Sequence, residues 1–296
     1  MAGPAVIARE TRSLCGLKSG AGFASRAAMK QLLALSAAIT LAACSQAETP
    51  APAPEPAQTD AFLEGLKADY PVTLSKLADG VWVHTTNYRL PGQSPIGVNG
   101  LVVVDGDAVT LVDGAWGELA TVALLERVKA ATGKPVTRMI VTHHHADRTA
   151  GVDAAERAGV EIFTHPTTPG LAARAGYPAP NTSVTALAEP KSRTRVGKVE
   201  IAYPGPGHAS DNLVAYLPEE KILYGGCMVR GAGVTTLGNV EDADLEQWAE
   251  SLDWTRGTYK DATTVVPGHG KGSTLVLLAT TRAMVGEAIA AQEPSP

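Results

Sequence analysis

Cysteine is scarce in this sequence. The 296 residues include three, at Cys15, Cys44 and Cys227. So few and such widely separated cysteines cannot form a disulfide framework, and each one needs its own explanation. A small fold held together by disulfides is therefore excluded.

The chain also lacks a surplus of basic residues. Its formal net charge is −5, and five of its 25 basic residues but one of its 30 acidic residues fall within residues 1–43. Residues 44–296 therefore carry 20 basic and 29 acidic groups, a net charge of −9. Because an acidic body repels a phosphate backbone, we expect no nucleic-acid partner.

The N-terminal region has no hydrophobic run long enough to span a bilayer. The apolar run after Met29 and Lys30 covers residues 32–43, which is about half of the ~20 residues that a spanning helix needs. It ends in Leu-Ala-Ala-Cys44, which resembles the lipobox of bacterial lipoproteins, whose cysteine carries the lipid. We predict an untranslated extension at 1–28, a signal peptide at 29–43 and a lipid anchor at Cys44. An ordinary secretory signal, cleaved elsewhere, is the alternative.

A proline-rich stretch follows the predicted anchor. Residues 44–60 have proline at positions 50, 52, 54 and 56, which favours extended polyproline II structure and cannot build a core. We interpret this stretch as a spacer between a membrane and the folded part. Neither Ser45 nor Gln46 is acidic, which in such lipoproteins implies sorting to the outer membrane, facing the periplasm.

The remaining residues, 61–296, predict one α/β domain without a fixed-period repeat. Early strands follow one another without intervening helices, which favours two sheets packed face to face with helices outside, over a doubly wound parallel sheet. A Pro- and Gly-rich segment at 87–97 joins two strands and is either an ordinary loop or a mobile flap. Strands are predicted at 72–77, 81–88, 100–104, 108–112, 136–141, 160–164, 199–203, 213–216, 222–224 and 264–266, and helices at 118–131, 152–158, 245–258 and 273–290.

Histidines and acids gather directly after one predicted strand. In the segment IVTHHHADR, His143, His145 and Asp147 leave the strand end at alternate positions and can converge on one point. Two imidazoles and a carboxylate suit Zn²⁺. His144, between them, is predicted to point away.

Three more candidate ligands follow later strands. Alone, His208 and His269 could be ordinary loop or core histidines, but each directly follows a Pro-Gly turn after an apolar run. Cys227 follows a strand and two glycines, and an unpaired thiol in an exported protein is tolerable when a metal holds it. The six positions together predict a three-histidine set and an Asp, Cys, His set, and so two cations.

The order and spacing of these residues resemble the metallo-β-lactamases, specifically the cysteine-containing subclass B1. The match extends to LVDGAWG, with Asp113 and Trp116, to Arg148 and to the segment around Asn239. Glyoxalase II and most other relatives have a histidine after the Asp and a bridging Asp instead of Cys227, so Arg148 and Cys227 separate this chain from them. The resemblance implies a single-domain, four-layer αβ/βα sandwich with two Zn²⁺ per chain, the first held by His143, His145 and His208 and the second by Asp147, Cys227 and His269.

The resemblance also implies an activity and a role for each site residue. The activity is hydrolysis of the β-lactam amide bond of penicillins, cephalosporins and carbapenems by a zinc-bound hydroxide, which confers antibiotic resistance. Asp147 and Asn239 would be catalytic, Arg230 would bind the substrate carboxylate with Asn239, and Arg148 and Asp113 would support the ligands.

Several of these readings have an alternative. Arg230, where the family commonly has lysine, could be a solvated surface arginine, and Asn239 and Asp113 could be turn formers. Hydrolysis of lactones or thioesters is the first alternative activity, and a non-catalytic zinc-binding lipoprotein is the second. We expect a monomer that touches the membrane only through its lipid.

Overall fold

The computed structural model describes residues 7–9, 60–89, 92 and 94–292. The predicted signal peptide, Cys44 and most of the Pro-rich spacer lie outside the described residues. Within the described part, no helix is both long and apolar enough to cross a membrane.

The first half of the domain forms a six-stranded sheet in the order β2-β3-β4-β5-β6-β7. The strands from β2 to β5 pair antiparallel, whereas β5, β6 and β7 run parallel. Parallel strands need a crossover, and α2 supplies it between β5 and β6. The strands are β2 (Thr73–Ala78), β3 (Val81–Tyr88), β4 (Ile96–Asp105), β5 (Ala108–Val112), β6 (Val136–Ile140) and β7 (Glu161–Phe163).

The second half forms a five-stranded sheet in the order β13-β12-β11-β10-β9. Its strands pair antiparallel except β12 and β13, which are parallel and joined through α6. Its strands are β9 (Ser192–Val196), β10 (Val199–Tyr203), β11 (Val214–Leu217), β12 (Ile222–Gly226) and β13 (Thr264–Pro267). A separate two-stranded pair joins β1 (Ile7–Arg9) to β8 (Thr182–Val184).

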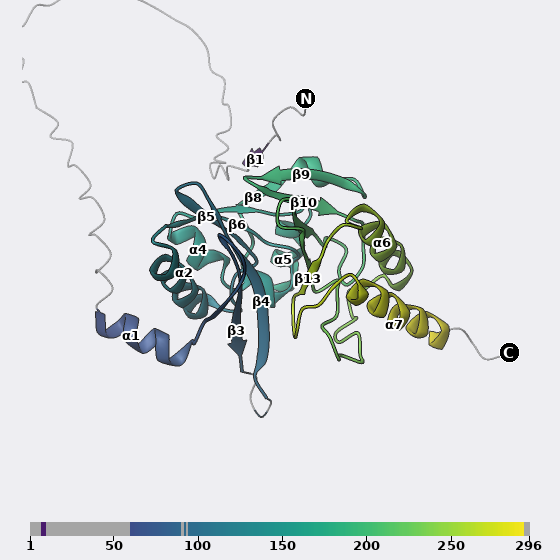
Figure 1. Cartoon of the computed structure of the whole chain (residues 1–296), viewed down its shortest axis with the longest axis horizontal. Helices are drawn as coiled ribbons and strands as arrows, with labels where there is room; N and C mark the ends of the chain where they lie inside the picture. The colour runs from purple at the N-terminus through teal and green to yellow at the C-terminus, as the bar shows by residue number, and fades with distance from the viewer. Residues whose placement is uncertain (1–6, 10–59, 90–91, 93, 293–296) are drawn as a thin grey trace, which may run out of the picture. The chain divides into compact units, whose positions relative to one another are not determined.

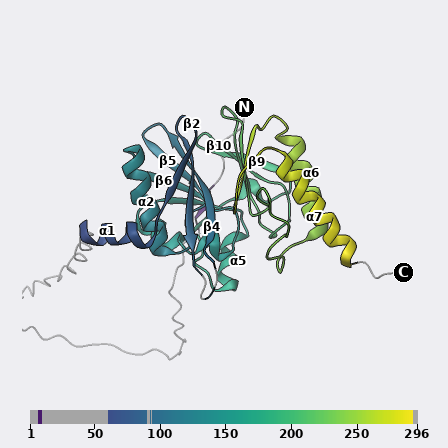
Figure 2. The same ribbon diagram turned by 60° about the horizontal axis from the view of Figure 1, so that its bottom comes forward.

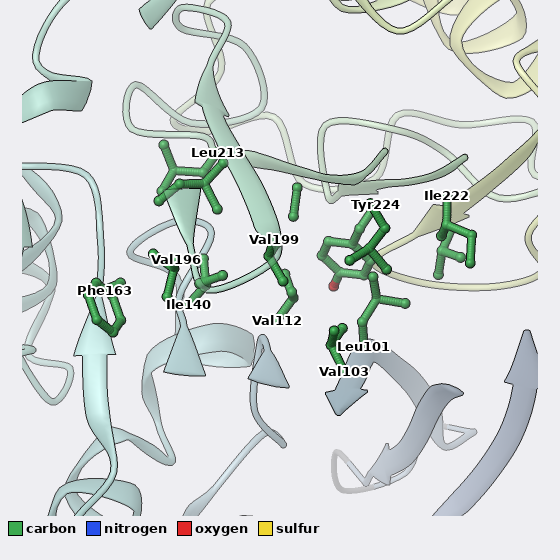
Figure 3. Close-up of a cluster of buried hydrophobic side chains, with 14 of the residues drawn as sticks. Leu101, Val103, Val112, Ile140, Phe163, Val196, Val199, Leu213, Ile222 and Tyr224 are labelled. Atoms are coloured by element: carbon green, nitrogen blue, oxygen red, sulfur yellow. The ribbon is translucent and has the colours of Figure 1, made fainter. Parts of the chain in front are cut away.

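The two sheets pack face to face through aliphatic side chains that alternate along the strands. Leu101, Val103 and Val112 of the first sheet meet Val199 and Tyr224 of the second in one buried cluster, shown in Figure 3. Successive residues of a strand face opposite sides of the sheet, so every second side chain points away from this cluster. These outward side chains are covered by helices.

Helices cover the outer face of each sheet (Figures 1 and 2). Those on the first sheet bury Leu124 and Val128 against its outer side chains, and those on the second bury Trp248 and Leu252. The four-layer αβ/βα sandwich predicted for a single domain is thus confirmed. The helices are α1 (Asp60–Asp69), α2 (Glu118–Thr132), α3 (Ala146–Thr149), α4 (Val152–Arg157), α5 (Thr168–Ala175), α6 (Leu245–Thr258) and α7 (Val276–Gln292), and Thr185–Leu187 form a 3-10 turn, η1.

The predicted connection at 87–97 is shorter in the structure. The β3–β4 ladder continues to the pairs Asn87–Gly97 and Tyr88–Ile96, so the strand predicted at 100–104 begins at Ile96. Cross-strand hydrogen bonds outweigh the weak strand preference of Gly97 here. Leu90, Pro91 and Gln93 lie outside the described residues.

Strand ends from both sheets meet at one edge of the sandwich. Residues after β5 and β6 reach this edge from the first sheet, and residues after β12 and β13 reach it from the second. Asn99 of β4 ties the two together, because its backbone N–H donates to Gly268 O at 2.9 Å and its amide donates to the carbonyls of Pro267 and Gly270. Polar side chains at these ends are therefore held by rigid backbone on both sides.

Candidate metal centre

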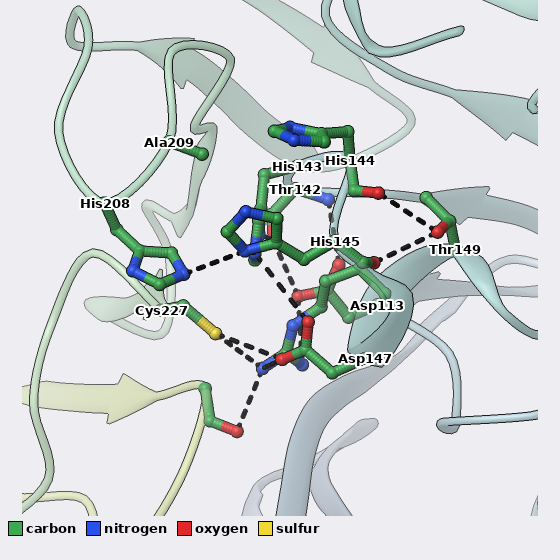
Figure 4. Close-up of polar contacts among 12 residues, drawn as sticks. Asp113, Thr142, His143, His144, His145, Asp147, Thr149, His208, Ala209 and Cys227 are labelled. Carbon is green, nitrogen blue, oxygen red and sulfur yellow. Dashed lines mark hydrogen bonds and ion pairs between the residues drawn. The ribbon is translucent and has the colours of Figure 1, made fainter. Parts of the chain in front are cut away.

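Three histidine rings converge at the edge where the strands end. Nδ1 of His145 lies 3.1 Å from Nε2 of His143 and 3.1 Å from Nε2 of His208, as Figure 4 shows. His143 follows β6 and His145 caps α3, whereas His208 comes from the loop between β10 and β11. Three ring nitrogens that face one point form an arrangement that a shared cation stabilises.

Burial sets the protonation of these rings. It lowers the pKa of His143 well below its usual value and, helped by the neighbouring His145, lowers the pKa of His208 to about 3. Both rings are therefore neutral near pH 7. Neutral imidazole is the form that binds a metal.

A second group of donors lies beside the first. Oδ2 of Asp147 is 2.9 Å from Nε2 of His269 and 3.4 Å from Sγ of Cys227. Nδ1 of His269 lies 2.7 Å from Gly97 O, which can only accept, so Nδ1 is protonated and Nε2 faces the donor group. Asp147 links the two groups, because its Oδ1 is 3.8 Å from Nε2 of His143.

The second group attracts positive charge. Burial opposes protonation of His269, but the negative charges of Cys227 and Asp147 outweigh it and raise the pKa of His269 to about 10. A set of three histidine nitrogens beside a set of oxygen, sulfur and nitrogen donors suits zinc in both places. The donor chemistry therefore fits the metal that the sequence predicted.

A fully buried arginine lies beneath the second group. Nη2 of Arg148 is 2.9 Å from Sγ of Cys227 and 3.1 Å from Oδ2 of Asp147, and its Nη1 donates to Asn99 O at 3.0 Å. Burial would raise the pKa of Asp147, but the Arg148 charge and the adjacent histidines hold it well below its usual value. Asp147 is therefore a carboxylate near pH 7.

A buried acid supports Arg148 in turn. Asp113 accepts hydrogen bonds from the backbone N–H and the hydroxyl of Thr142 and from the Tyr224 hydroxyl, each at 2.8 Å. One Asp113 oxygen lies 3.4 Å from Nη1 of Arg148. Because Thr142 directly precedes His143, the Asp113 carboxylate fixes the start of the histidine segment.

The two donor groups open into a cavity of about 450 Å³. Its walls combine apolar side chains, Ile96 and Trp116, with the polar Arg230 and Asn239. A larger cavity of about 710 Å³ lies beyond Trp116, between α1 and the start of α2, and it contains no residue of either donor group. A substrate that reaches the donor groups would therefore bind in the smaller cavity.

Comparison with known proteins agrees with this geometry. Residues 94–269 match the family model of the metallo-beta-lactamase superfamily. A metallo-beta-lactamase type 2 from Bacillus sp. (strain 170) is 38% identical over 200 residues, which cover 68% of this chain and 77% of the relative. Another from Bacteroides fragilis is 30% identical over 227 residues, covering 76% and 90%.

The chain belongs to the metallo-beta-lactamase superfamily. Among solved structures, a metallo-beta-lactamase from Hirschia baltica is 35% identical with a TM-score of 0.70, covering 73% of this chain and 98% of that one. The FIM-1 metallo-beta-lactamase of Pseudomonas aeruginosa, in its mono-zinc form, is 32% identical with a TM-score of 0.70, covering 74% and 96%. The resemblance that the sequence motifs indicated is confirmed.

For this superfamily member, the structure brings all six predicted ligands to one place. Asp147, Cys227 and His269 form one group of donors, and the His145 ring lies within 3.1 Å of both His143 and His208. Arg148 lies where it was predicted, against Asp147. Asp113 fits both predictions made for it, a turn former and a support for the ligands. It has a positive φ of 60° at the strand end, and its carboxylate is fully buried. His144 does not join the central donors, since its Nδ1 lies 2.9 Å from Asp211.

The two predicted substrate-binding residues line the cavity without touching the central donors. Arg230 is partly buried and its Nε donates to Thr236 O at 2.9 Å, so it is not a free surface arginine. Asn239 is exposed, and its Oδ1 accepts from the N–H of Glu241 at 3.0 Å, which makes it a turn residue as well as a wall residue.

Sequence reasoning missed Asp242. Its Oδ2 lies 2.9 Å from Nε2 of His145, on the side of the ring opposite the metal-facing Nδ1. Metal-binding histidines commonly donate their second N–H to a carboxylate. The segment LGNVEDAD offered three acids, and nothing in its pattern distinguished Asp242 from Glu241 or Asp244.

Proposed function

We propose that this protein hydrolyses the amide bond of β-lactams in a metal-dependent reaction. The observation that carries the proposal is the convergence of two donor sets at the floor of an open cavity. A site that only stored metal would be expected to close its coordination shell with protein donors, whereas a three-histidine set leaves a position free for chemistry. The relatives that share 30–38% identity are named metallo-beta-lactamases.

Two Zn²⁺ per chain are part of the proposal. His143, His145 and His208 would hold one, and Asp147, Cys227 and His269 the other. Bound zinc supplies Lewis-acid activation of water and of a carbonyl.

The side chains around the donors supply position and charge. Asp147 is ionised and lies between the two groups, so it can accept a hydrogen bond from the attacking water and orient it. The Asn239 amide can donate to the oxygen that gains negative charge during attack. Arg230 supplies a cation for the substrate carboxylate, and Trp116 and Ile96 supply apolar contact.

Hydrolysis of a chromogenic cephalosporin and a carbapenem by the purified protein tests the proposal. We expect turnover of both, abolished by a chelator and restored by zinc, with two zinc ions per chain by elemental analysis. Chelator-sensitive turnover of a lactone or thioester but of neither lactam would replace the substrate class. Two bound zinc ions without turnover of any of these would favour a zinc-binding lipoprotein.

We propose further that the protein is a periplasmic lipoprotein of the bacterial outer membrane, and that it acts as a monomer. The lipid anchor is supported by the sequence around Cys44, which lies outside the described residues. In a Gram-negative host, the full-length protein should fractionate with outer membranes, and Cys44→Ser should release it into the soluble periplasmic fraction. Equal fractionation of Cys44→Ser and the unaltered protein would exclude lipid attachment at Cys44.

A further inference from the structure

His84 is a fully buried histidine that the proposed mechanism does not use. It lies in the middle of β3, and its Nε2 is 3.0 Å from the carbonyl oxygen of Asp113. Because a carbonyl only accepts, Nε2 carries the proton and donates. Burial lowers the pKa of His84 to about 4, so the ring is neutral near pH 7 and has this single N–H.

The other ring nitrogen of His84 is unsatisfied. Nδ1 has no hydrogen-bond partner among the described residues, although it is buried. An unpaired buried acceptor costs free energy. An apolar side chain would be the more stable choice if filling space were the only role of this position.

The opposite strand is adapted to the His84 ring. Gly100 of β4 is the cross-strand partner of His84, and a Cβ at Gly100 would overlap Nε2 of His84 and the carbonyl oxygen of Val112. A residue with any side chain at position 100 would therefore displace the ring from Asp113. Two positions on neighbouring strands are thus specialised for one contact.

The contact holds a strained piece of backbone. Asp113 directly follows β5 and has a φ of 60°, a left-handed conformation that residues with a Cβ rarely adopt. In this conformation the Asp113 carboxylate points at Thr142, Tyr224 and Arg148. A hydrogen bond to its carbonyl oxygen restrains the same peptide.

We propose that His84 is a positioning residue of the metal centre. Its Nε2–H fixes the Asp113 backbone, the Asp113 carboxylate then fixes Thr142 and Arg148, and these hold His143 and the pair Asp147 and Cys227. The inference rests on the proposed metal-dependent function. The second donor group depends on it most, since Arg148 contacts Asp147, Cys227 and His269 directly.

Three variants of β3 separate positioning from packing. His84→Leu keeps the volume and removes the donor, whereas His84→Gln keeps an N–H that can reach Asp113. Thr86→Val is the matched control, because Thr86 is buried on the same strand and its hydroxyl has no partner among the described residues. If His84→Leu does not fold, His84→Met, which is apolar and more adaptable, replaces it.

The measurements are zinc affinity by competition with a chromophoric chelator, the thiolate-to-metal charge-transfer absorption of the cobalt-loaded protein, and kcat and KM for a cephalosporin. Circular dichroism and thermal unfolding identify a temperature at which each variant is folded. We expect His84→Leu to lose about tenfold or more in affinity for the weaker-bound zinc, with weakened thiolate absorption. We also expect kcat to fall with little change in KM, and His84→Gln and Thr86→Val to stay close to the unaltered protein.

Unchanged zinc affinity and cobalt spectrum in folded His84→Leu would overturn the inference, as would equal losses in His84→Leu and His84→Gln. The metal readouts do not need lactam turnover. An unaltered protein that binds zinc but hydrolyses no lactam would therefore refute the proposed function and leave the test of His84 intact.

Discussion

Asp242 shows how one side chain reaches the site from far along the chain. Its side chain is 52% exposed, yet it lies 2.9 Å from His145, which precedes it by 97 residues. Because the carboxylate accepts, it places the His145 proton on Nε2 and leaves Nδ1 unprotonated, facing His143 and His208. The contact selects the ring form that can bind a metal.

Replacing Asp242 should weaken the three-histidine site. For Asp242→Ala we expect a loss of about tenfold in zinc affinity and in kcat/KM, at the lower end of such effects because water competes for an exposed carboxylate. Chelator competition and steady-state kinetics measure both. Glu241→Ala is the control, since Glu241 is the neighbouring exposed acid and its side chain lines the same cavity. Equal effects of the two variants would show that overall charge, and not the His145 contact, matters.

At the scale of elements, a ring stack attaches the end of strand β3 in the β3–β4 hairpin to the cavity wall. Tyr88, the last residue of β3, lies flat on Trp116 with ring centroids 4.1 Å apart and planes 9° apart. Trp116 comes from the connection between β5 and α2 and lines both cavities. The end of the hairpin is therefore positioned by a residue outside it.

Trp116→Ala should loosen this attachment. Such pairs contribute about 0.5–1.5 kcal/mol beyond the area they bury, so we expect a several-fold rise in KM for a cephalosporin and a smaller change in kcat. Trp254→Ala, on α6, is the control because it also removes an indole but lies away from both cavities. A KM that rises no more than in the control would mean that the stack does not position the hairpin for substrate.

At the scale of the whole molecule, the donor groups connect the two sheets. His143, His145 and Asp147 follow β6 of the first sheet, whereas His208, Cys227 and His269 follow strands of the second. Each donor set thus includes residues from both sheets. A cation held by either set would crosslink the halves of the sandwich.

Metal removal should therefore destabilise the whole domain. A ligand present at 100 to 1,000 times its Kd stabilises the folded state by about 3–4 kcal/mol, which corresponds to a fall in Tm of roughly 10 °C when it is removed. Calorimetry of the zinc-loaded and chelated protein measures the change, and zinc but not Mg²⁺ should reverse it. An unchanged Tm would show that the donors bind metal without joining the sheets.

The strand and helix pattern of the sequence was sufficient for much of the fold. The strands at 81–88, 108–112 and 199–203 and the helix at 245–258 have their predicted bounds, because apolar periodicity and turn residues act locally. α5 was not predicted, although Pro169 near its start and Gly176 at its end are typical helix boundaries. With eight residues, it is shorter than the stretch over which a helical repeat of apolar residues can be recognised.

The sequence by itself determined the candidate ligands, because histidine, aspartate and cysteine directly after strands must gather at a sheet edge and few other residues bind zinc. Only the tertiary structure decided which nitrogen of each ring faces the centre, that Asp242 contacts His145, and that Arg148 lies fully buried against Asp113, Asp147 and Cys227. It also placed His84 beneath Asp113, 29 residues away. These choices depend on contacts between segments that are far apart in the sequence. Which polar atoms meet is determined by the packing of the two sheets, and no local sequence pattern encodes that packing.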